Sequence, residues 1–289
     1  MFNAGKTSKE WNAKKLQDEH FKVLMYESDA SKVFTNTDIK GGVAVTYRDI
    51  TKKYQPIGVY TKFPELNGIL HRVISYNIEP ISSIIFLQNK FDLDALYREH
   101  PTTQKQIGSG GRERRLTTSI FSTVDIFSKE PQPNSVLIWG LIKNIRVKRF
   151  IERKFLSQHE NLDKYKIVLP KVNGTGEFGE TLSSPMIAPP SVGFTQSFIS
   201  IGSFDSEKEA ASTLKYLKSK FSRAMLNVLK ITQDNNSDVW RYVPLQDFTD
   251  NSDINWNTSI ANIDKQLYKK YGLSQEEIDF IETHVKEME

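Results

Sequence analysis

Residues 206–233, SEKEAASTLKYLKSKFSRAMLNVLKITQ, contain the clearest helical pattern in the sequence. Ser206 and Glu209 have the spacing of a capping box, in which two side chains satisfy the first backbone N–H groups of a helix. After this start, apolar side chains recur at intervals of three and four residues, which predicts one amphipathic helix over residues 206–233 whose apolar stripe lies in a core. The stripe consists of Ala210, Leu214, Leu217, Phe221, Met225 and Val228.

Two further helices are predicted near the end of the chain, over residues 258–271 and 274–288. Gly272 stands where a helix end favours a left-handed backbone, and Ser274 with Glu277 repeats the capping box. Six carboxylates in and after the last helix would repel phosphate groups, so a helix-turn-helix reader of DNA is disfavoured there. We expect this helix to pack through an apolar stripe made of Ile278, Ile281 and Val285.

Upstream of these helices, short apolar runs alternate with turn-rich stretches. Residues 136–142 (VLIWGLI) and 166–169 (KIVL) are predicted to be buried strands on either side of a basic segment. The glycine-rich residues 108–111 and the stretch 173–190 are predicted to be loops.

The first sixty residues are typical of the end of a doubly wound sheet. Thr7 and Glu10 have capping-box spacing for a helix that ends near His20, and strands are predicted over residues 20–27, 42–47 and 57–61. No glycine-rich turn follows a strand here, so no nucleotide-binding half is expected. The sequence therefore predicts an α/β (mixed α+β) class, with the end of a Rossmann-like sheet followed by a mixed α+β domain and C-terminal helices.

Composition excludes several classes of protein. The 289 residues are 38% hydrophobic and 11% aromatic, which is typical of a folded globular chain, and no apolar run is long enough for a membrane span. The chain has no cysteine, which excludes disulfides, thiolate metal sites and thiol nucleophiles. No signal peptide is visible, so a cytoplasmic location is expected.

The net charge of +4 is unevenly distributed. Residues 140–171 contain nine basic and three acidic residues, whereas residues 250–289 contain four basic and nine acidic residues. Such segregation indicates either one face that meets a polyanion or an ordinary solvated basic face. Composition alone leaves both interpretations open.

The sequence contains no complete metal-dependent catalytic motif. Glu152 and Lys154 match the short Glu-x-Lys piece of metal-dependent nucleases, but the nearest upstream acidic residue, Asp125, is not in a matching context. The five histidines are scattered and no zinc-protease spacing occurs, so no metal site is expected. The nuclease interpretation stays open as the least favoured alternative.

Several longer segments resemble adenine-specific DNA methyltransferases of type II restriction-modification systems. The resemblance begins with residues 2–7 (FNAGKT), Trp11 and residues 38–43 (DIKGGV), which are similar to the segment after the catalytic motif of that family. It continues through most of the chain, in residues 202–204 (GSF) before 209–210 (EA), residues 240–244 (WRYVP) and residues 260–281.

The resemblance implies an incomplete enzyme. In that family the methyl-donor half and an Asn/Asp-Pro-Pro motif precede the late strands and a target recognition domain. This sequence has no Asn-Pro-Pro or Asp-Pro-Pro, and its one Pro-Pro pair, Pro189-Pro190, follows Ala188. We therefore expect residues 1–63 to be a partial methyltransferase domain and residues 64–289 a target recognition domain. No catalytic residue and no cofactor are expected in this chain, and S-adenosylmethionine would bind only with a separate N-terminal half.

The resemblance also implies a set of DNA-contacting residues and one base-stacking residue. Phe34, placed before the late strand, is the candidate that stacks on a flipped adenine; the alternative is a core phenylalanine at a strand start. Phosphate contacts and guanine contacts to double-stranded DNA are assigned to the basic residues of the recognition domain. These are Arg112, Arg114, Arg115, Lys143, Arg146, Lys148, Arg149, Arg153 and Lys154. A folded interaction remnant without useful DNA binding is the other alternative.

Overall fold

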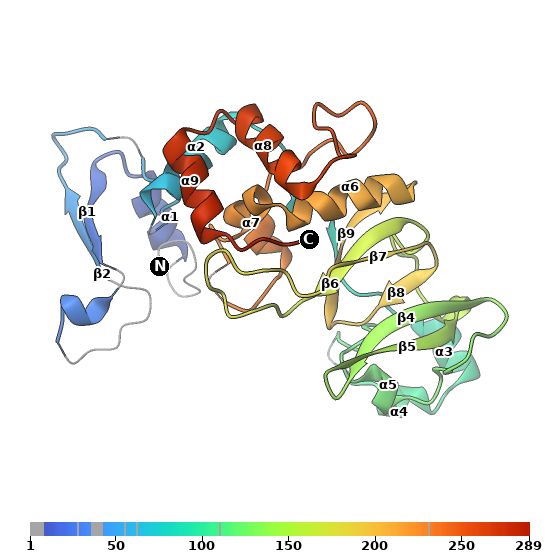
Figure 1. Ribbon diagram of the computed structural model, residues 1–289. Helices are drawn as coiled ribbons and strands as arrows, with labels where there is room; N and C mark the ends of the chain where they lie inside the picture. The colour runs from blue at the N-terminus through green and yellow to red at the C-terminus, as the bar shows by residue number, and fades with distance from the viewer. Residues whose placement is uncertain are drawn as a thin grey trace. The chain divides into compact units, whose positions relative to one another are not determined.

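The computed structural model describes residues 9–27, 29–35, 43–54, 56–61, 63–109, 111–230 and 232–289. They form two compact units, Met1–Ser75 and Tyr76–Glu289, built from helices and several small sheets (Figure 1). The predicted mixed α and β class is confirmed. The helix α2 (Pro64–Ser75), which the sequence boundary at residue 63 places with the second domain, belongs to the first unit.

The first unit contains a short helix and a two-stranded sheet. Helix α1 (Lys9–Gln17) precedes strand β1 (Phe21–Glu27), the 3-10 turn η1 (Ala30–Lys32) and strand β2 (Val43–Arg48). The two strands are antiparallel, and their register shifts between Val23 and Met25. The predicted helix and the first two strands are confirmed, whereas their membership of a doubly wound sheet stays a prediction.

The predicted third strand over residues 57–61 is wrong. Gly58 has φ +63, a left-handed backbone that interrupts an extended strand. Its N–H donates to the carbonyl oxygen of Leu16 at 2.8 Å, so the backbone of this segment is bonded to the end of α1. The predicted cap at Thr7 and the motif residues 2–7 and 38–42 lie outside the described residues.

The second unit is built around two small sheets. One has the strand order β3-β9-β6-β7 with antiparallel neighbours, and the other has the order β5-β4-β8, in which β4 and β8 are parallel. The predicted strands at 136–142 and 166–169 are confirmed as β4 and β6. The strands are β3 (Ile85–Phe86), β4 (Ser135–Ile142), β5 (Ile145–Glu152), β6 (Tyr165–Pro170), β7 (Met186–Ala188), β8 (Val192–Phe194) and β9 (Phe198–Phe204).

Short helices and 3-10 turns connect and cover these strands. Before β4 they are η2 (Ile81–Ile84), α3 (Leu93–Glu99), α4 (Thr103–Gln106) and α5 (Ile120–Thr123). After β5 they are η3 (Arg153–Phe155), α6 (Glu207–Lys218), α7 (Lys220–Leu226), η4 (Ser237–Trp240), α8 (Ile260–Lys270) and α9 (Gln275–His284). Helix α6 packs against β6, β7 and β9 and also contacts α8. No helix in the described part of the chain is long and apolar enough to cross a bilayer.

The predicted single helix over residues 206–233 is in fact two helices. Ser219 has an extended backbone (φ −60, ψ 149) between α6 and α7, and its side chain accepts a hydrogen bond from the N–H of Ser222 at 3.1 Å. Ser219 therefore ends one helix and caps the next. The capping box of Ser206 and Glu209 is confirmed, and the stripe is buried except for Leu214, which is half-buried.

The C-terminal helices follow the prediction more closely. Gly272 has φ +59, and the capping box of Ser274 and Glu277 is confirmed. Helix α9 ends earlier than predicted, at His284. Ile281 and Val285 are buried as expected, whereas Ile278 is half-buried.

Strand β4 lies between two clusters of buried apolar side chains. Val136 and Ile138 belong to a cluster that also contains Leu116 of the preceding loop. Trp139 belongs to a second cluster with Phe194 and Phe198. Because both faces of β4 are packed, the adjacent strand β5 is held firmly at the edge of its sheet.

Candidate nucleic-acid interface

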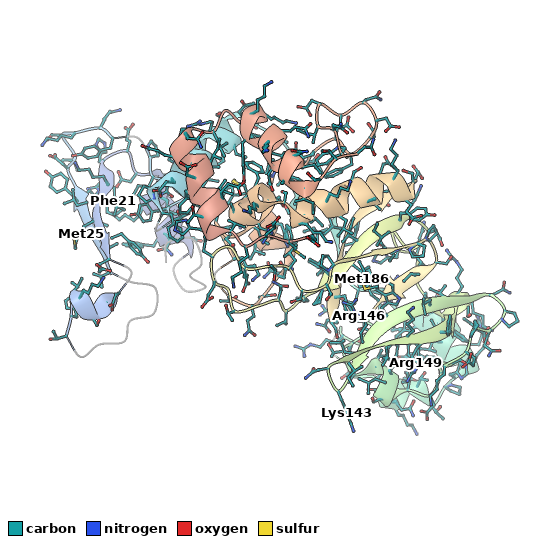
Figure 2. The ribbon with its side chains drawn as sticks, in the orientation of Figure 1. Phe21, Met25, Lys143, Arg146, Arg149 and Met186 are labelled. Carbon is teal, nitrogen blue, oxygen red and sulfur yellow. The ribbon has the colours of Figure 1, made fainter. Side chains whose placement is uncertain are left out.

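The basic segment of the sequence forms the second strand of a regular hairpin. Strands β4 and β5 pair without a break from Ser135↔Glu152 to Ile142↔Ile145. The turn residues Lys143 and Asn144 have φ +49 and +62, as a two-residue hairpin turn with two left-handed residues requires. Lys143 therefore lies exposed at the tip of the hairpin (Figure 2).

The basic side chains of β5 do not share one face. Side chains alternate along a strand, so Arg146 and Lys148 lie on the face of Trp139, and Arg149 lies on the opposite face. In agreement, the Arg149 guanidinium lies 6.0 Å from the ring centre of Phe121 in the other cluster. The hairpin thus carries cations at its tip and on both faces, with Lys148 exposed.

A second group of arginines lies on a turn of the same unit. Arg112, Arg114 and Arg115 are exposed, and the N–H of Arg115 donates to the carbonyl oxygen of Arg112 at 3.0 Å. The turn is joined to the fold by an isolated bridge between Lys90 and Arg115 and by the buried Leu116. Because Leu116 and the β4 residue Val136 share one apolar cluster, the arginine turn and the hairpin belong to one packed body.

Two of the nine predicted DNA-contacting residues are already paired with carboxylates. Arg153 forms an ion pair with Asp163, and a hydrogen bond to that carboxylate raises the pKa of Arg153. Lys154 lies 2.6 Å from a carboxylate oxygen of Glu99 and 3.0 Å from one of Glu152, and these hydrogen bonds raise its pKa. Their positive charge is therefore offset within the protein.

The other seven predicted residues have no carboxylate partner within the ranges that the structure describes. Six of them lie on the hairpin or the arginine turn, five of them exposed and Arg149 half-buried, and the seventh, Arg146, is half-buried against Met186 and Phe198. The six are Arg112, Arg114, Arg115, Lys143, Lys148 and Arg149.

The positive charge of the chain is concentrated in the segment that contains these residues. Residues 89–160, called the basic lobe below, contain 13 of the 39 basic residues and 8 of the 35 acidic residues, a net charge of +5. The remaining 26 basic and 27 acidic residues nearly cancel. The net charge of the chain therefore comes from the basic lobe.

The nine basic residues counted over residues 140–171 include two lysines beyond residue 160, Lys164 and Lys166, that do not add to the basic surface. Burial lowers the pKa of Lys166 to about 8, and its ammonium donates to the carbonyl oxygens of Asn161 at 2.8 Å and Lys164 at 2.9 Å. The side chain of Lys164 is ion-paired with Asp205. Neither lysine is presented as a free cation.

Phe34, the predicted base-stacking residue, lies in the first unit. Its N–H donates to the carbonyl oxygen of Ala30 at 2.8 Å, and 51% of the side chain is exposed. It is not in a strand, so the alternative of a core phenylalanine at a strand start is not supported. Its stacking role stays a prediction.

Glu152, the centre of the nuclease alternative, pairs with Lys154 as described above. Among the described residues no group of three His, Asp or Glu side chains could hold a metal ion. The Glu-x-Lys pattern here forms a local ion pair beside Glu99.

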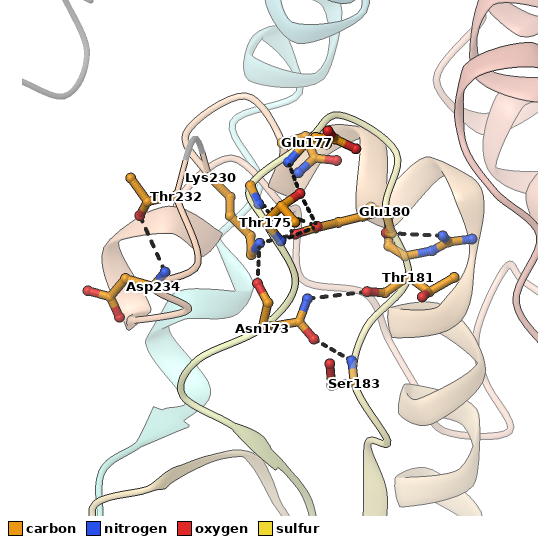
Figure 3. Close-up of polar contacts among 12 residues, drawn as sticks. Asn173, Thr175, Glu177, Glu180, Thr181, Ser183, Lys230, Thr232 and Asp234 are labelled. Atoms are coloured by element: carbon orange, nitrogen blue, oxygen red, sulfur yellow. Dashed lines mark hydrogen bonds and ion pairs between the residues drawn. The ribbon is translucent and has the colours of Figure 1, made fainter. Parts of the chain in front are cut away.

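Sequence reasoning missed a buried ion pair that organises the loop between β6 and β7. The ammonium of Lys230 contacts the carboxylate of Glu180 and donates to the carbonyl oxygen of Asn173 at 3.0 Å (Figure 3). The same carboxylate accepts the N–H of Thr175 at 2.7 Å and that of Gly176 at 3.2 Å. Fifty residues separate the two charges, so spacing gave no signal of the pair.

Comparison with known proteins adds no assignment. No family model matches the chain, and a search of curated proteins finds no relative with significant similarity.

Proposed function

We propose that this chain is the DNA-binding, target-recognition portion of an adenine-specific DNA methyltransferase of a restriction-modification system. The observation that carries the proposal is the basic lobe, with six cations that lack a carboxylate partner in the described structure. Duplex DNA is the polyanion that such a surface suits, because each neutralised phosphate releases condensed counterions. The lack of cysteines is compatible with a cytoplasmic location.

The end of the hairpin has a shape that duplex DNA accommodates. The major groove admits a two-stranded β-ribbon, and β4–β5 has this form beyond Trp139, where β4 no longer pairs with β8. Lys143 lies at the tip of this ribbon, and Lys148 and Arg149 follow it on the edge strand β5. The arginine turn of the same packed body would reach a neighbouring stretch of backbone. Methyl transfer itself is assigned to an N-terminal methyltransferase half that carries the Asn/Asp-Pro-Pro motif.

The test is a binding titration of the purified chain against a fluorescein-labelled duplex about two helical turns long. Fluorescence anisotropy at several salt concentrations should give an affinity that falls steeply with salt, with a log–log slope of about −0.9 per phosphate contacted. Absence of saturable binding at low salt would overturn the proposal. In calorimetry, the isolated chain should show no saturable uptake of S-adenosylmethionine, and micromolar binding would contradict the assignment of residues 1–63.

An interaction remnant is the second candidate, favoured only by the ion-paired state of Arg153 and Lys154. A chain that unfolds in a cooperative thermal transition but binds no duplex would support the interaction remnant over the DNA-binding protein.

A further inference from the structure

We infer that Arg146 is the residue of the hairpin that reads a base, a guanine presented in the major groove, and that the surrounding cations contact phosphates. This inference rests on the proposed function and assigns a specificity-determining residue to it. Its basis is that Arg146 has more contacts with the rest of the protein than the other basic side chains of the hairpin have.

The guanidinium of Arg146 is fixed by four neighbours. It donates to the sulfur of Met186 and, at 3.4 Å, to the carbonyl oxygen of Ser184. Its carbon lies 5.2 Å from the ring centre of Phe198 and 6.0 Å from that of Trp139, two buried rings. Figure 2 shows Arg146 beside Met186 at the seam between the two sheets.

These neighbours are themselves held in place. Met186 pairs with Val168 in the β6–β7 ladder. The loop before it is tied by the amide of Asn173, which donates to Thr181 at 3.2 Å and accepts from the N–H of Ser183 (Figure 3). The buried pair of Glu180 and Lys230 anchors the same loop. The position of Arg146 is therefore set by a chain of contacts that reaches the core of the unit.

The other cations of the hairpin have fewer such contacts. Lys143 and Lys148 are exposed, and a lysine is a point charge on a flexible stem. Arg149 is half-buried and has two contacts against the four of Arg146: its guanidinium donates to the carbonyl oxygen of its neighbour Lys148 at 2.8 Å and lies 6.0 Å from the ring centre of Phe121. These side chains suit phosphates, which carry no sequence information.

Arg146 keeps the donors that base recognition needs. The contacts with Met186 and Ser184 use two of the five guanidinium N–H groups, so three remain without an acceptor in the described structure. Because the guanidinium of Arg146 is already fixed in the free protein, it loses little conformational entropy when it donates two hydrogen bonds to O6 and N7 of guanine. Base readers must be placed accurately, whereas phosphate contacts tolerate mobility.

The test is selection from a pool of duplexes whose central base pairs are randomised. Wild type and the Arg146→Lys and Arg149→Lys variants are compared, and sequencing gives the preference at each position. We expect Arg146→Lys to lower the preference for one G·C pair by roughly 5- to 150-fold, the equivalent of a good bidentate contact. Arg149→Lys, the matched control, should keep the selected sequence and change only the total amount bound.

A second variant tests the support without touching the arginine. Met186→Leu preserves side-chain volume and removes the sulfur acceptor, so it should weaken the preference at the same base pair. Selection of the same sequence with the same discrimination by wild type and Arg146→Lys, or a wild type that binds without preference, would overturn the assignment of Arg146. Failure of wild type to bind any duplex would instead overturn the proposed function.

Discussion

Removing either partner of the buried pair Glu180–Lys230 should cost the second unit a large part of its stability. The side chain of Lys230 is 1% exposed and that of Glu180 is 10% exposed, so a charge left alone remains in a poorly solvated site. Breaking such a pair costs about 3–5 kcal/mol, against a typical total of about 5–15 kcal/mol for a folded protein. We expect Lys230→Met and Glu180→Gln each to lose an amount in this range.

The double variant makes the test specific to the charges. Glu180→Gln with Lys230→Met removes both ions at similar volume, so it should lose much less stability than the sum of the two single variants. Urea unfolding followed by circular dichroism measures all three variants. Lys208→Gln, which breaks an exposed pair with Asp250, is the control and should leave the midpoint unchanged.

Two results would show that Glu180 and Lys230 do not stabilise the fold as a coupled pair. One is a loss below about 1 kcal/mol for both single variants, the value of an exposed pair. The other is a double variant whose loss equals the sum of the single losses, because then the two groups are not coupled.

The pair should also give the protein a defined response to acid. Burial alone would raise the pKa of Glu180, but the hydrogen bonds from Lys230, Thr175 and Gly176 outweigh it and hold that pKa below the ordinary 4.5. A carboxyl group with a lowered folded pKa stabilises the protein above its unfolded pKa and loses that contribution as the pH falls through the folded one. Wild type should therefore lose more stability than Glu180→Gln on acidification below about pH 4.5.

Three further predictions concern the helices. Ser219→Ala removes the cap of α7 and should lower the free energy of unfolding by about 0.5–2 kcal/mol in urea melts, and no change would mean that the cap is dispensable. Burial raises the pKa of Asp264 to about 6, so its destabilising charge is present above that pH and is relieved as the pH falls toward 4. Melting temperatures of Asp264→Asn should lack this component, and parallel pH profiles of the variant and wild type would contradict it. Ile281→Ala should cost about 2–5 kcal/mol and leave duplex binding unchanged, whereas lost binding with unchanged melting would place the DNA face on α9.

Features set by neighbouring residues could be predicted from the sequence. The capping boxes at Ser206 and Ser274 and the left-handed Gly272 depend on contacts within one helical turn, and all three are present. Strands β4 and β6 were recognisable because a continuous apolar run needs burial on both faces.

Two features could not be predicted from the hydrophobic pattern, because each depends on the backbone conformation of a single residue within that pattern. The apolar stripe continues from Leu217 to Phe221 at helical spacing, so periodicity gave no sign of the break at Ser219. The prediction of a third strand over residues 57–61 is wrong because Gly58 adopts a left-handed backbone inside this apolar run.

The candidate site was predictable in composition but not in arrangement. The sequence located a basic cluster, yet the division of roles within it depends on partners that lie 10 to 40 residues further along the chain. Arg146 meets Ser184 and Met186, and Arg153 meets Asp163, only after the fold has formed. The pairing of Glu180 with Lys230 is of the same kind.

The proposed function requires that the cations of the hairpin contact DNA phosphates. The measurement is the salt dependence of duplex binding for wild type and for a variant with Lys143, Lys148 and Arg149 all changed to Gln. A matched control changes three exposed lysines of the acidic C-terminal region to Gln: Lys265, Lys269 and Lys286. We expect the hairpin variant to flatten the log–log slope by about 2.7, roughly 0.9 per contact, and the control to retain the wild-type slope. A hairpin variant that remains folded and keeps the wild-type slope would contradict the claim.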